Sequence, residues 1–289
     1  STIIWENTPV MGQIQITKRS ADDNPYNAVP AGSPLPGATF EIYNRAGNLV
    51  NTVVTDKNGI ATSDTLPLGR YTIRETKAPM FYSAATQPIE TEIEFSGQIV
   101  RVEVLNKSVY TNVAVTKRGY KQAAPAQTIR YDFKNIANNS SVPLNSFYWR
   151  DTLPASAVRL TKIVTGTWNQ QLSYKVVYKT NLHDYRTLAD NLSTMKNYSL
   201  DASPAALGLA SNEYVTDFMF VFGTVKAGFA QVDAPYIFCQ TNSWLNNGYQ
   251  FANRTDVGGL HGGQWIMATD RWVTTIYKAG VPKLPKTGY

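Results

Sequence analysis

The sequence predicts an all-β protein made of two β-sandwich domains in tandem, and three observations lead to this prediction. Short segments alternate between apolar and polar residues, as in residues 13–17 and 99–104. Turn signals separate these segments, as at residues 56–59 and 66–69, where Gly and Asn tolerate positive φ. The strands recur at a spacing of roughly 8–12 residues, which is typical of sandwiches. Because 289 residues suffice for about two domains, we expect two immunoglobulin-like sandwiches, the second one larger.

The same pattern predicts the domain borders. Residues 12–107 are expected to form the first sandwich and residues 108–279 the second, with a short joint between their strand patterns. Within the second, residues 183–209 are mixed polar and small, so we expect a long insertion there, the one stretch that could hold short helices. Residues 1–11 are expected to end a missing upstream domain, and residues 280–289 to form a linker. The chain is therefore interpreted as a fragment.

Composition and charge exclude several classes of protein. Apolar residues make up 43% of the chain and charged residues 17%, which is a globular composition. The net charge of +6 is spread over scattered residues and does not favour nucleic-acid binding. No run approaches the roughly 20 apolar residues of a membrane span. Cys239 is the only cysteine and is expected to be a buried thiol, while His183 and His261 are too few for a metal site. We therefore expect no cofactor and no metal.

Polar residues occupy three positions of the first domain where the alternation predicts apolar ones. Alternate residues of a strand share one face. Three such series are Ile14, Ile16 and Lys18; Tyr71, Ile73 and Glu75; and Val102, Val104 and Asn106. Burying an unpaired ammonium or carboxylate costs several kcal/mol, so these polar residues should meet. The alternative is that Lys18, Glu75 and Asn106 are unconnected surface residues.

A buried meeting of Lys18, Glu75 and Asn106 has chemical consequences. Burial lowers the pKa of Lys and raises that of Glu, so both groups can become neutral. A neutral amine is a nucleophile, and a protonated Glu can polarise the Asn carbonyl. Attack with loss of ammonia would leave a Lys–Asn isopeptide bond. Such a reaction occurs once per molecule, so it is maturation rather than turnover.

The first domain resembles the Cna B-type pilin domains. Four segments carry this resemblance: residues 12–18, 35–43, 55–59 and 66–79. The resemblance implies that Lys18 is the nucleophile, Glu75 the proton shuttle and Asn106 the acceptor of an isopeptide bond. One departure is visible, because residues 80–82 read Met-Phe-Tyr where the family usually has a Gly-Tyr pair.

The second domain repeats this logic. Its three series are Val113, Val115 and Lys117; Phe147, Trp149 and Asp151; and Tyr249, Phe251 and Asn253. It resembles the Cna A-type, isopeptide-forming surface domains, which implies Lys117 as nucleophile, Asp151 as proton shuttle and Asn253 as acceptor. Asp132 competes for the acid role, although the alternation predicts that it points outward. A buried salt bridge without a bond is the other alternative.

The two ends of the chain carry further signals. Ile3, Trp5 and Asn7 share a face, so Asn7 is interpreted as the acceptor residue of a missing upstream domain. Near the C-terminus stand the residues Leu284, Pro285, Lys286, Thr287 and Gly288. They match the sortase sorting signal of Gram-positive surface proteins. This resemblance implies cleavage after Thr287 and transfer to an amine of a cell-wall precursor or a neighbouring pilin. A missing hydrophobic span beyond Tyr289 would be the only contact with the membrane.

These observations predict an extracellular structural protein anchored to the wall of a Gram-positive bacterium. Shaft-forming pilins carry an acceptor Lys in a Tyr-Pro-Lys type motif, and residues 177–179 (Val-Tyr-Lys) lack the Pro. A minor or basal pilin, or an unpolymerised wall protein, is therefore favoured over a shaft pilin. An enzyme acting on external substrates is disfavoured, since no Ser–His or Cys–His constellation is evident.

The alternative function is adhesion to a host ligand through the second domain. Five of the six tryptophans fall there: Trp149, Trp168, Trp244, Trp265 and Trp272. Exposed aromatic residues make binding platforms, whereas a large sandwich also needs large core residues. Exposure and clustering of these rings would decide between the two interpretations.

Overall fold

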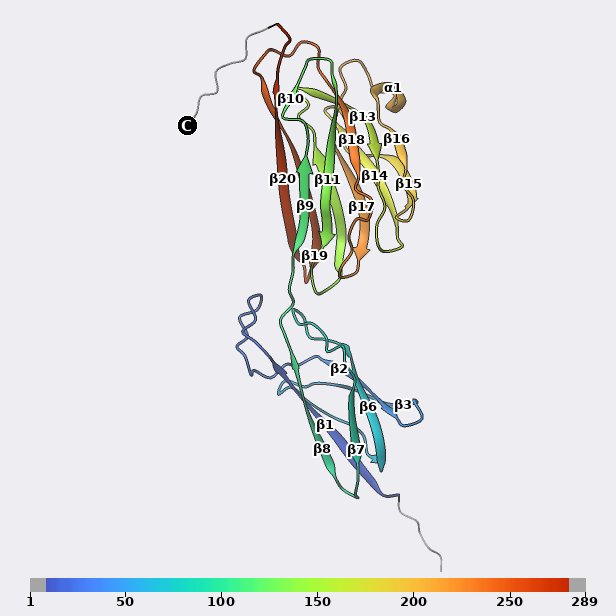
Figure 1. Ribbon diagram of the computed structural model, residues 1–289. Helices are drawn as coiled ribbons and strands as arrows, with labels where there is room; N and C mark the ends of the chain where they lie inside the picture. The colour runs from blue at the N-terminus through green and yellow to red at the C-terminus, as the bar shows by residue number, and fades with distance from the viewer. Residues whose placement is uncertain (1–8, 281–289) are drawn as a thin grey trace, which may run out of the picture. The chain divides into compact units, whose positions relative to one another are not determined.

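The computed structural model describes residues 9–280 (Figure 1). The chain divides into two compact units, Ser1–Val109 and Tyr110–Tyr289. Both are built from strands, and the only helix among the described residues is α1 (Pro204–Leu207), which is far too short to cross a membrane. The prediction of an all-β protein with tandem sandwiches is confirmed.

The first unit contains two four-stranded sheets. One has β1 (Met11–Ser20) at its centre, paired with β4 (Ile60–Thr62), β5 (Leu66–Pro67) and β8 (Ile99–Asn106). The other has the order β3 (Leu49–Val54), β2 (Thr39–Asn44), β6 (Gly69–Lys77) and β7 (Ile89–Ile93). The core consists of apolar side chains from both sheets, including Ile14, Ile16, Phe40 and Ile73.

Strand β1 shows why polar residues enter this core. Its residues alternate between partly exposed and buried along the whole strand, so Lys18 shares the inner face with Ile14 and Ile16. β8, the last strand of the unit, runs parallel to β1, with Lys18 opposite Val104 and Ser20 opposite Asn106. Because Val104 and Asn106 share a face, the side chains of Lys18 and Asn106 lie on one surface of the sheet.

A single glycine allows the chain to pass close behind Lys18. Gly59 has a φ of +71°, and a Cβ atom there would lie 2.5 Å from the carbonyl oxygen of Lys18. The main-chain N–H of Lys18 donates to the carbonyl oxygen of Gly59 at 2.7 Å. The turn before β4 therefore needs glycine both for its conformation and for space.

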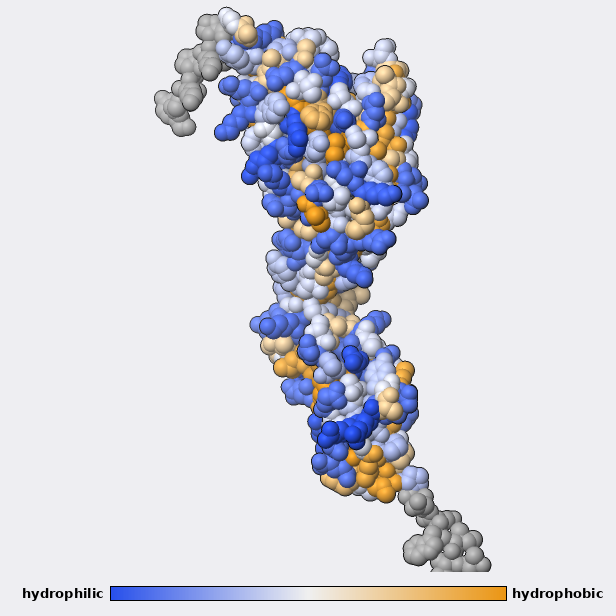
Figure 2. Space-filling view, turned by 45° about the vertical axis from the view of Figure 1, so that its right-hand side comes forward, coloured by the Kyte–Doolittle hydropathy of each residue, from blue (hydrophilic) through white to orange (hydrophobic). Residues whose placement is uncertain are grey.

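Hydrophobic residues also gather on the surface of the first unit, at the end where β1 begins (Figure 2). The large exposed ones near the start of β1 and the β7–β8 turn include Val10, Val50, Leu68, Phe95 and Ile99. Main-chain hydrogen bonds from Gly97 to Met11 and from Gln13 to Gln98 hold the β7–β8 turn against the start of β1. This apolar end is separate from the core that surrounds Lys18.

The second unit is a larger sandwich of a seven-stranded and a five-stranded sheet. The seven-stranded sheet has the order β10 (Gln122–Ala123), β20 (Gln264–Ile276), β19 (Gln250–His261), β12 (Leu144–Thr152), β17 (Val215–Val225), β14 (Ser173–Thr180) and β15 (Arg186–Ser193). The five-stranded sheet has the order β16 (Ser199–Asp201), β13 (Val158–Val164), β18 (Tyr236–Thr241), β11 (Thr128–Asn138) and β9 (Val113–Arg118). Strand β9 lies at one edge of its sheet and contacts β19 and β20 of the other.

Aromatic rings fill the space between these two sheets. Trp149 is fully buried and packs edge-on against Phe220, with ring centroids 4.6 Å apart. Trp168 stacks on Phe229 at 5.3 Å. Cys239 is fully buried on β18, as predicted for a core thiol, and burial raises its pKa.

Residues 183–209, the one stretch expected to be able to hold short helices, contain α1, the only helix among the described residues, together with two edge strands. β15 pairs with β14 and β16 pairs with β13, so these strands extend both sheets at their edges. Helix α1 has only four residues, with Ser203 as its N-cap and Gly208 in the left-handed conformation after it. The polar composition of the segment suits edge strands, which are solvated and need few apolar residues.

Candidate cross-linking sites

The first candidate site lies in the core of the first unit and joins both of its sheets. Lys18 comes from β1 and Asn106 from the neighbouring β8, while Glu75 comes from β6 of the facing sheet. All three side chains are buried. The Lys18 Nζ lies 3.4 Å from Glu75 Oε1 and donates a hydrogen bond to Asn106 Oδ1. The Asn106 Nδ2 donates to Glu75 Oε1 at 2.8 Å. The structure thus brings the three sequence-predicted residues together.

The surroundings hold Glu75 in a fixed position and keep water out. The main-chain N–H of Ala85 donates to Glu75 Oε2 at 2.6 Å. Phe40 is opposite Glu75 in the β2–β6 pair, and its ring centroid lies 5.7 Å from Lys18 Nζ. An apolar ring on one side and a fixed carboxyl on the other restrict the amine to one approach towards Asn106.

Burial changes the acidity of the Lys18 amine. Desolvation lowers the pKa of Lys18 from 10.5 to about 8, although the negative charge and hydrogen bond of Glu75 act to raise it. At pH 7 roughly a tenth of such an amine is neutral and able to act as a nucleophile. We expected the Glu75 carboxyl group to contact the carbonyl oxygen of Asn106. It contacts the amide nitrogen of Asn106 instead. It is therefore placed on the group that would leave.

The second candidate site lies in the core of the second unit. Lys117 comes from the edge strand β9, Asp151 from β12 and Asn253 from β19, and none of the three is accessible to solvent. The Lys117 Nζ donates to Asp151 Oδ1 at 2.6 Å. It also lies 3.9 Å from the ring centroid of Phe133 and 4.5 Å from that of Tyr131. The main-chain N–H of Lys117 donates to Asp270 on β20 at 2.7 Å, which fixes β9 against the facing sheet.

Asn253 is buried in this site without a hydrogen bond of ordinary geometry. Neither its amide nitrogen nor its amide oxygen has a partner among the described residues, and Asp151 Oδ2 has none either. Asp151 is opposite Thr255, two residues from Asn253, so both side chains share the inner face of neighbouring strands. An unsatisfied buried polar group costs about 1–3 kcal/mol and calls for an explanation.

The pair of Lys117 and Asp151 is shifted towards its neutral form. Burial is the largest influence on both groups, and it lowers the pKa of Lys117 and raises that of Asp151. Their mutual attraction opposes both shifts, and the nearby Asn253 amide also acts to lower the pKa of Asp151. In a fully buried pair the loss of hydration favours the transfer of the proton from the amine to the carboxylate.

The competing acid, Asp132, lies elsewhere. Its carboxylate accepts two hydrogen bonds from Arg130, at 2.6 and 2.8 Å, and its side chain is 31% exposed. The Arg130 guanidinium in turn lies 3.7 Å from the ring centroid of Tyr236. The structure therefore places Asp151, and not Asp132, next to Lys117.

Some predicted residues fall outside the described part of the chain. These are Asn7, with its neighbours Ile3 and Trp5, and the signal residues Leu284, Pro285, Lys286, Thr287 and Gly288. Among residues 9–280, no group of three or more His, Cys, Asp or Glu side chains could hold a metal ion.

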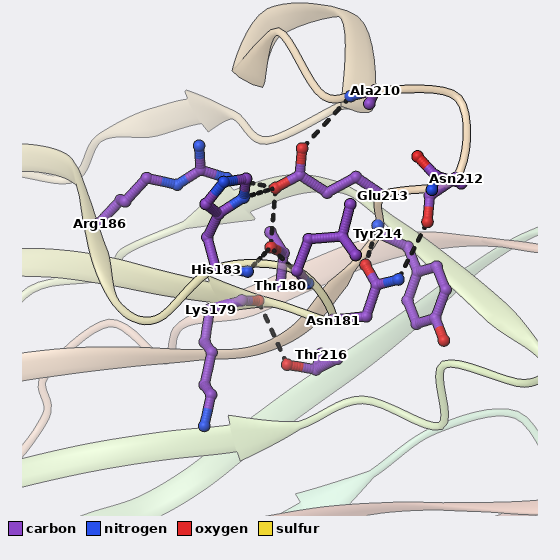
Figure 3. Close-up of polar contacts among 11 residues, drawn as sticks. Lys179, Thr180, Asn181, His183, Arg186, Ala210, Asn212, Glu213, Tyr214 and Thr216 are labelled. Carbon is purple, nitrogen blue, oxygen red and sulfur yellow. Dashed lines mark hydrogen bonds and ion pairs between the residues drawn. The ribbon is translucent and has the colours of Figure 1, made fainter.

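A polar cluster around Glu213 was missed by sequence reasoning (Figure 3). Glu213 Oε1 accepts from Thr180 at 2.8 Å and from Arg186 at 2.6 Å, and it lies 2.8 Å from His183 Nδ1. The hydrogen bonds from His183 and Thr180, followed by the Ala210 N–H and the charge of Arg186, lower the pKa of Glu213 to about 2. Glu213 lies in the loop between α1 and β17, whereas its three partners belong to β14, β15 and the turn between them. The cluster fastens two loops together, and no local sequence pattern signals such a contact.

The tryptophans of the second unit divide between core and surface. Trp149 and Trp168 are buried, Trp272 is partly buried, and Trp244 and Trp265 are 66% and 53% exposed. Trp244 lies in the loop between β18 and β19, beside Ala126 and Arg159, whereas Trp265 is paired with Leu260 near the last residue of β19. They do not form one aromatic cluster.

Comparison with known proteins identifies the class of the first unit. Residues 12–108 match the family described as "SpaA: Prealbumin-like fold domain". The chain is also 32% identical over 108 residues to a trypsin-resistant surface T6 protein of Streptococcus pyogenes. The matched segment covers 37% of this chain and 19% of that protein. Residues 12–108 are therefore similar to a prealbumin-like SpaA domain, and the resemblance noted for this part of the sequence is confirmed. The chain spans about a fifth of the length of the curated relative.

Several solved pilin structures match this chain. BcpA, the major pilin subunit of Bacillus cereus, is 17% identical, with coverage of 92% of this chain and 69% of that chain and a TM-score of 0.31. The major pilin SpaD of Corynebacterium diphtheriae is 18% identical, with coverage of 95% and 67% and a TM-score of 0.30. GBS52, the minor pilin of Streptococcus agalactiae, is 23% identical, with coverage of 37% and 48% and a TM-score of 0.31.

Proposed function

We propose that this chain is part of a structural surface protein or pilus subunit of a Gram-positive bacterium, stiffened by one Lys–Asn isopeptide bond in each unit. The observation that carries the proposal is the buried contact of Lys18 with Glu75 and Asn106, in a domain whose family and surface-protein relative point the same way. The relative is described as trypsin-resistant, which fits a fold closed by covalent cross-links. On this proposal the protein is not an enzyme for external substrates, since each reaction consumes its own side chains.

In the first unit the reaction begins with the neutral Lys18 amine. Its Nζ attacks Cγ of Asn106, forming the new C–N bond, and the proton released from Nζ passes to Glu75. Glu75 returns a proton to Asn106 Nδ2, which it already contacts, and the C–Nδ2 bond breaks with departure of ammonia. The products are one amide and one ammonia, and Glu75 ends as it began. The fixed positions of the three groups supply the effective molarity that a slow amide exchange needs.

In the second unit the corresponding residues are Lys117, Asp151 and Asn253. Burial favours the neutral amine and the protonated carboxyl, so the proton transfers run in the opposite order. Asp151 first gives its proton to Asn253 Nδ2, and it then takes up the proton that Lys117 Nζ releases as Nζ bonds to Asn253 Cγ and ammonia leaves. Asp151 is hydrogen-bonded to the nucleophile and lies beside the carboxamide. The unpartnered amide atoms of Asn253 support its role as the acceptor.

The location of the bonds suits a protein under tension. β1 and β8 are the first and last strands of the first unit, so a Lys18–Asn106 bond connects the points where force enters and leaves. Lys117 on β9 and Asn253 on β19 likewise belong to the first strand of the second unit and the one before its last. Force then passes through covalent bonds instead of separating strands one hydrogen bond at a time.

The sorting signal at residues 284–288 completes the proposal. Sortase would cleave after Thr287 and join it to a cell-wall precursor or to a neighbouring pilin subunit, placing the protein outside the cell and anchored to the wall. The absence of a Tyr-Pro-Lys type motif from this sequence favours a minor or basal subunit over a shaft subunit.

Intact mass spectrometry tests the cross-links directly. The purified chain should be lighter than its sequence mass by two ammonia molecules. Lys18→Ala and Lys117→Ala should each lose one fewer ammonia, whereas Lys57→Ala, which removes an exposed amine, should still lose both. Digestion should give branched peptides that join Lys18 to Asn106 and Lys117 to Asn253. A parent chain at its full sequence mass would refute the cross-linking proposal for both units.

A further inference from the structure

One row of side chains on the outer face of the seven-stranded sheet has features of a binding surface. Strand β20 alternates along its length, and its outward residues are exposed: Trp265, Met267, Thr269, Arg271 and Val273. The Trp265 ring packs edge-on against Tyr148 of β12, with centroids 5.8 Å apart. Tyr148 itself lies over Gly258, where a Cβ atom would come within 2.9 Å of its ring. The Trp265 ring is therefore held in place by Tyr148, and the pair forms an exposed aromatic surface at one end of the row.

Two arginines lie at the other end without counter-charges. Arg254 on β19 is directly opposite Arg271 on β20, and both are exposed. Neither guanidinium makes a hydrogen bond or an ion pair within residues 9–280, whereas Arg150 beside them is paired with Asp256. Like charges directly opposite each other on neighbouring strands destabilise a sheet. An arrangement with this cost suggests an anionic partner.

Two carboxylates lie near these arginines. Asp256 accepts from Arg150 at 2.9 and 3.0 Å and from Tyr148 at 2.7 Å, so its charge is matched. Asp270 keeps its charge, but it accepts from the main-chain N–H groups of Lys117, on the facing sheet, and Arg271. Arg254 and Arg271 against Asp270 leave an excess of one positive charge in this part of the surface.

A shallow depression of about 460 Å³ lies at the arginine end of the row and extends as far as Met267. Besides Arg254 and Arg271, its lining includes Thr152, Thr269, Arg150, Asp256 and Asp270. From Trp265 to Arg271 the row extends about 20 Å at ~3.4 Å per residue, which is enough for several sugar rings. The threonine hydroxyls offer hydrogen bonds that sugar hydroxyls can take.

We propose that this strip, defined as Tyr148, Trp265, Met267, Arg254 and Arg271, binds an acidic glycan, a polysaccharide with carboxylate or sulfate groups. The weakly positive C–H face of a sugar ring packs on the negative face of the Trp265 ring. The guanidinium forks of Arg254 and Arg271 match the geometry of a carboxylate or sulfate. A peptide that added a strand would bind along the edge of β20, beyond the two residues that β10 pairs with, and not on the face that carries Trp265, Arg254 and Arg271. The proposal does not depend on the isopeptide bonds.

Titration calorimetry of the whole chain with defined oligosaccharides tests this proposal. The probes are a hyaluronan hexasaccharide, which carries carboxylates alone, a chondroitin sulfate hexasaccharide, a neutral dextran oligosaccharide and a poly-glutamate peptide. We expect at least one acidic glycan to bind and the dextran to bind at least tenfold more weakly. The comparison of the two acidic glycans distinguishes carboxylate from sulfate as the recognised group.

Matched variants show whether the strip is the site. Arg254→Gln with Arg271→Gln should weaken glycan binding at least tenfold, and so should Trp265→Ala. Lys175→Gln, an exposed cation on β14 of the same sheet, and Trp244→Ala, the other exposed tryptophan, should leave it unchanged. The proposal is overturned if neither acidic glycan binds, if the control variants weaken binding equally, or if poly-glutamate binds as tightly as the glycans. The mass of each variant reports the cross-links separately, so failure here leaves the proposed function standing.

Discussion

At the residue scale, burial away from water changes the pKa values of the side chains at both candidate sites. Lys18 would be an ordinary cation on a surface, but in the core its pKa falls to about 8 and it contacts an amide that it can attack. Lys117 and Asp151 are driven towards neutrality by the same cause. In each unit a lysine, a carboxyl group and an asparagine are buried on inward faces, where apolar residues precede them along each strand.

The pH dependence of stability should reveal whether Lys18 is free. In Glu75→Gln the shuttle is lost and Lys18 should remain an amine, with a folded pKa at or below about 8 against 10.5 when unfolded. The unfolded chain then binds more protons between about pH 8 and 10.5, so stability should rise with pH across that window. The parent should lack this rise, because an amide nitrogen does not titrate there.

Thermal unfolding of the first unit from pH 7 to 10.5 measures this effect. The double variant Lys18→Met with Glu75→Gln removes the amine and is the control for all other groups that titrate in the window. Equal pH slopes in Glu75→Gln and in this double variant would contradict the prediction.

The acid of the second unit can be identified with a matched pair of variants. Asp151→Asn keeps the shape of the side chain but cannot shuttle a proton, so the Lys117–Asn253 bond should fail to form and one ammonia should be retained. Asp132→Asn changes a half-exposed carboxylate that is paired with Arg130 and should leave the bond intact. Intact mass gives the result, and retention of ammonia in Asp132→Asn alone would reverse the assignment.

At the scale of elements, strand pairing determines which reactants can meet. The parallel pair β1–β8 brings together Lys18 and Asn106, which are 88 residues apart in the sequence. The turn before β4 supports this pair from behind, because Gly59 lets the chain approach the main chain of Lys18. In the second unit, β9 is an edge strand that Asp270 of β20 holds in place through the N–H of Lys117.

Two glycine substitutions separate backbone strain from crowding. Gly59 and Gly37 both have positive φ, +71° and +83°, so alanine at either should cost about 1–2 kcal/mol. At Gly37 nothing lies within 4 Å of the new Cβ, whereas at Gly59 it would meet Lys18 and Leu35 main-chain atoms at 2.5 and 3.0 Å. Gly59→Ala should therefore destabilise the first unit by at least about 1 kcal/mol more and slow formation of its bond. Urea unfolding and intact mass measure the two effects, and equal losses in both variants would refute the role of crowding.

At the scale of the whole molecule, two separate hydrophobic cores predict two unfolding events. Each core is built from residues of one unit only. A cross-link between residues 88 positions apart stabilises a fold by about 4–5 kcal/mol in the chain-entropy view. Loss of one bond should thus affect the unit that contains it and leave the other unchanged.

Differential scanning calorimetry of the two lysine variants tests this independence. Lys18→Ala should lower the midpoint of one transition by about 15 °C or more, and Lys117→Ala should lower the other. Lys57→Ala should move neither transition. A shift of both transitions in either single variant would show that the units unfold together.

The sequence by itself determined the fold class, the apolar faces and the polar residues that interrupt them. Alternation with period two depends on local geometry alone, so it placed Lys18, Glu75 and Asn106 on inward faces before any contact was known. It also distinguished Asp151 from Asp132 by the side of the strand on which each lies.

Only the tertiary structure decided what depends on contacts between distant segments. It made β15 and β16 into edge strands, built the Glu213 cluster from two loops, and set Arg254 opposite Arg271. It also put the Glu75 carboxyl on the amide nitrogen of Asn106 instead of on the oxygen. Register and loop packing result from the sum of many weak interactions across the sandwich, and no local pattern in the sequence contains that sum.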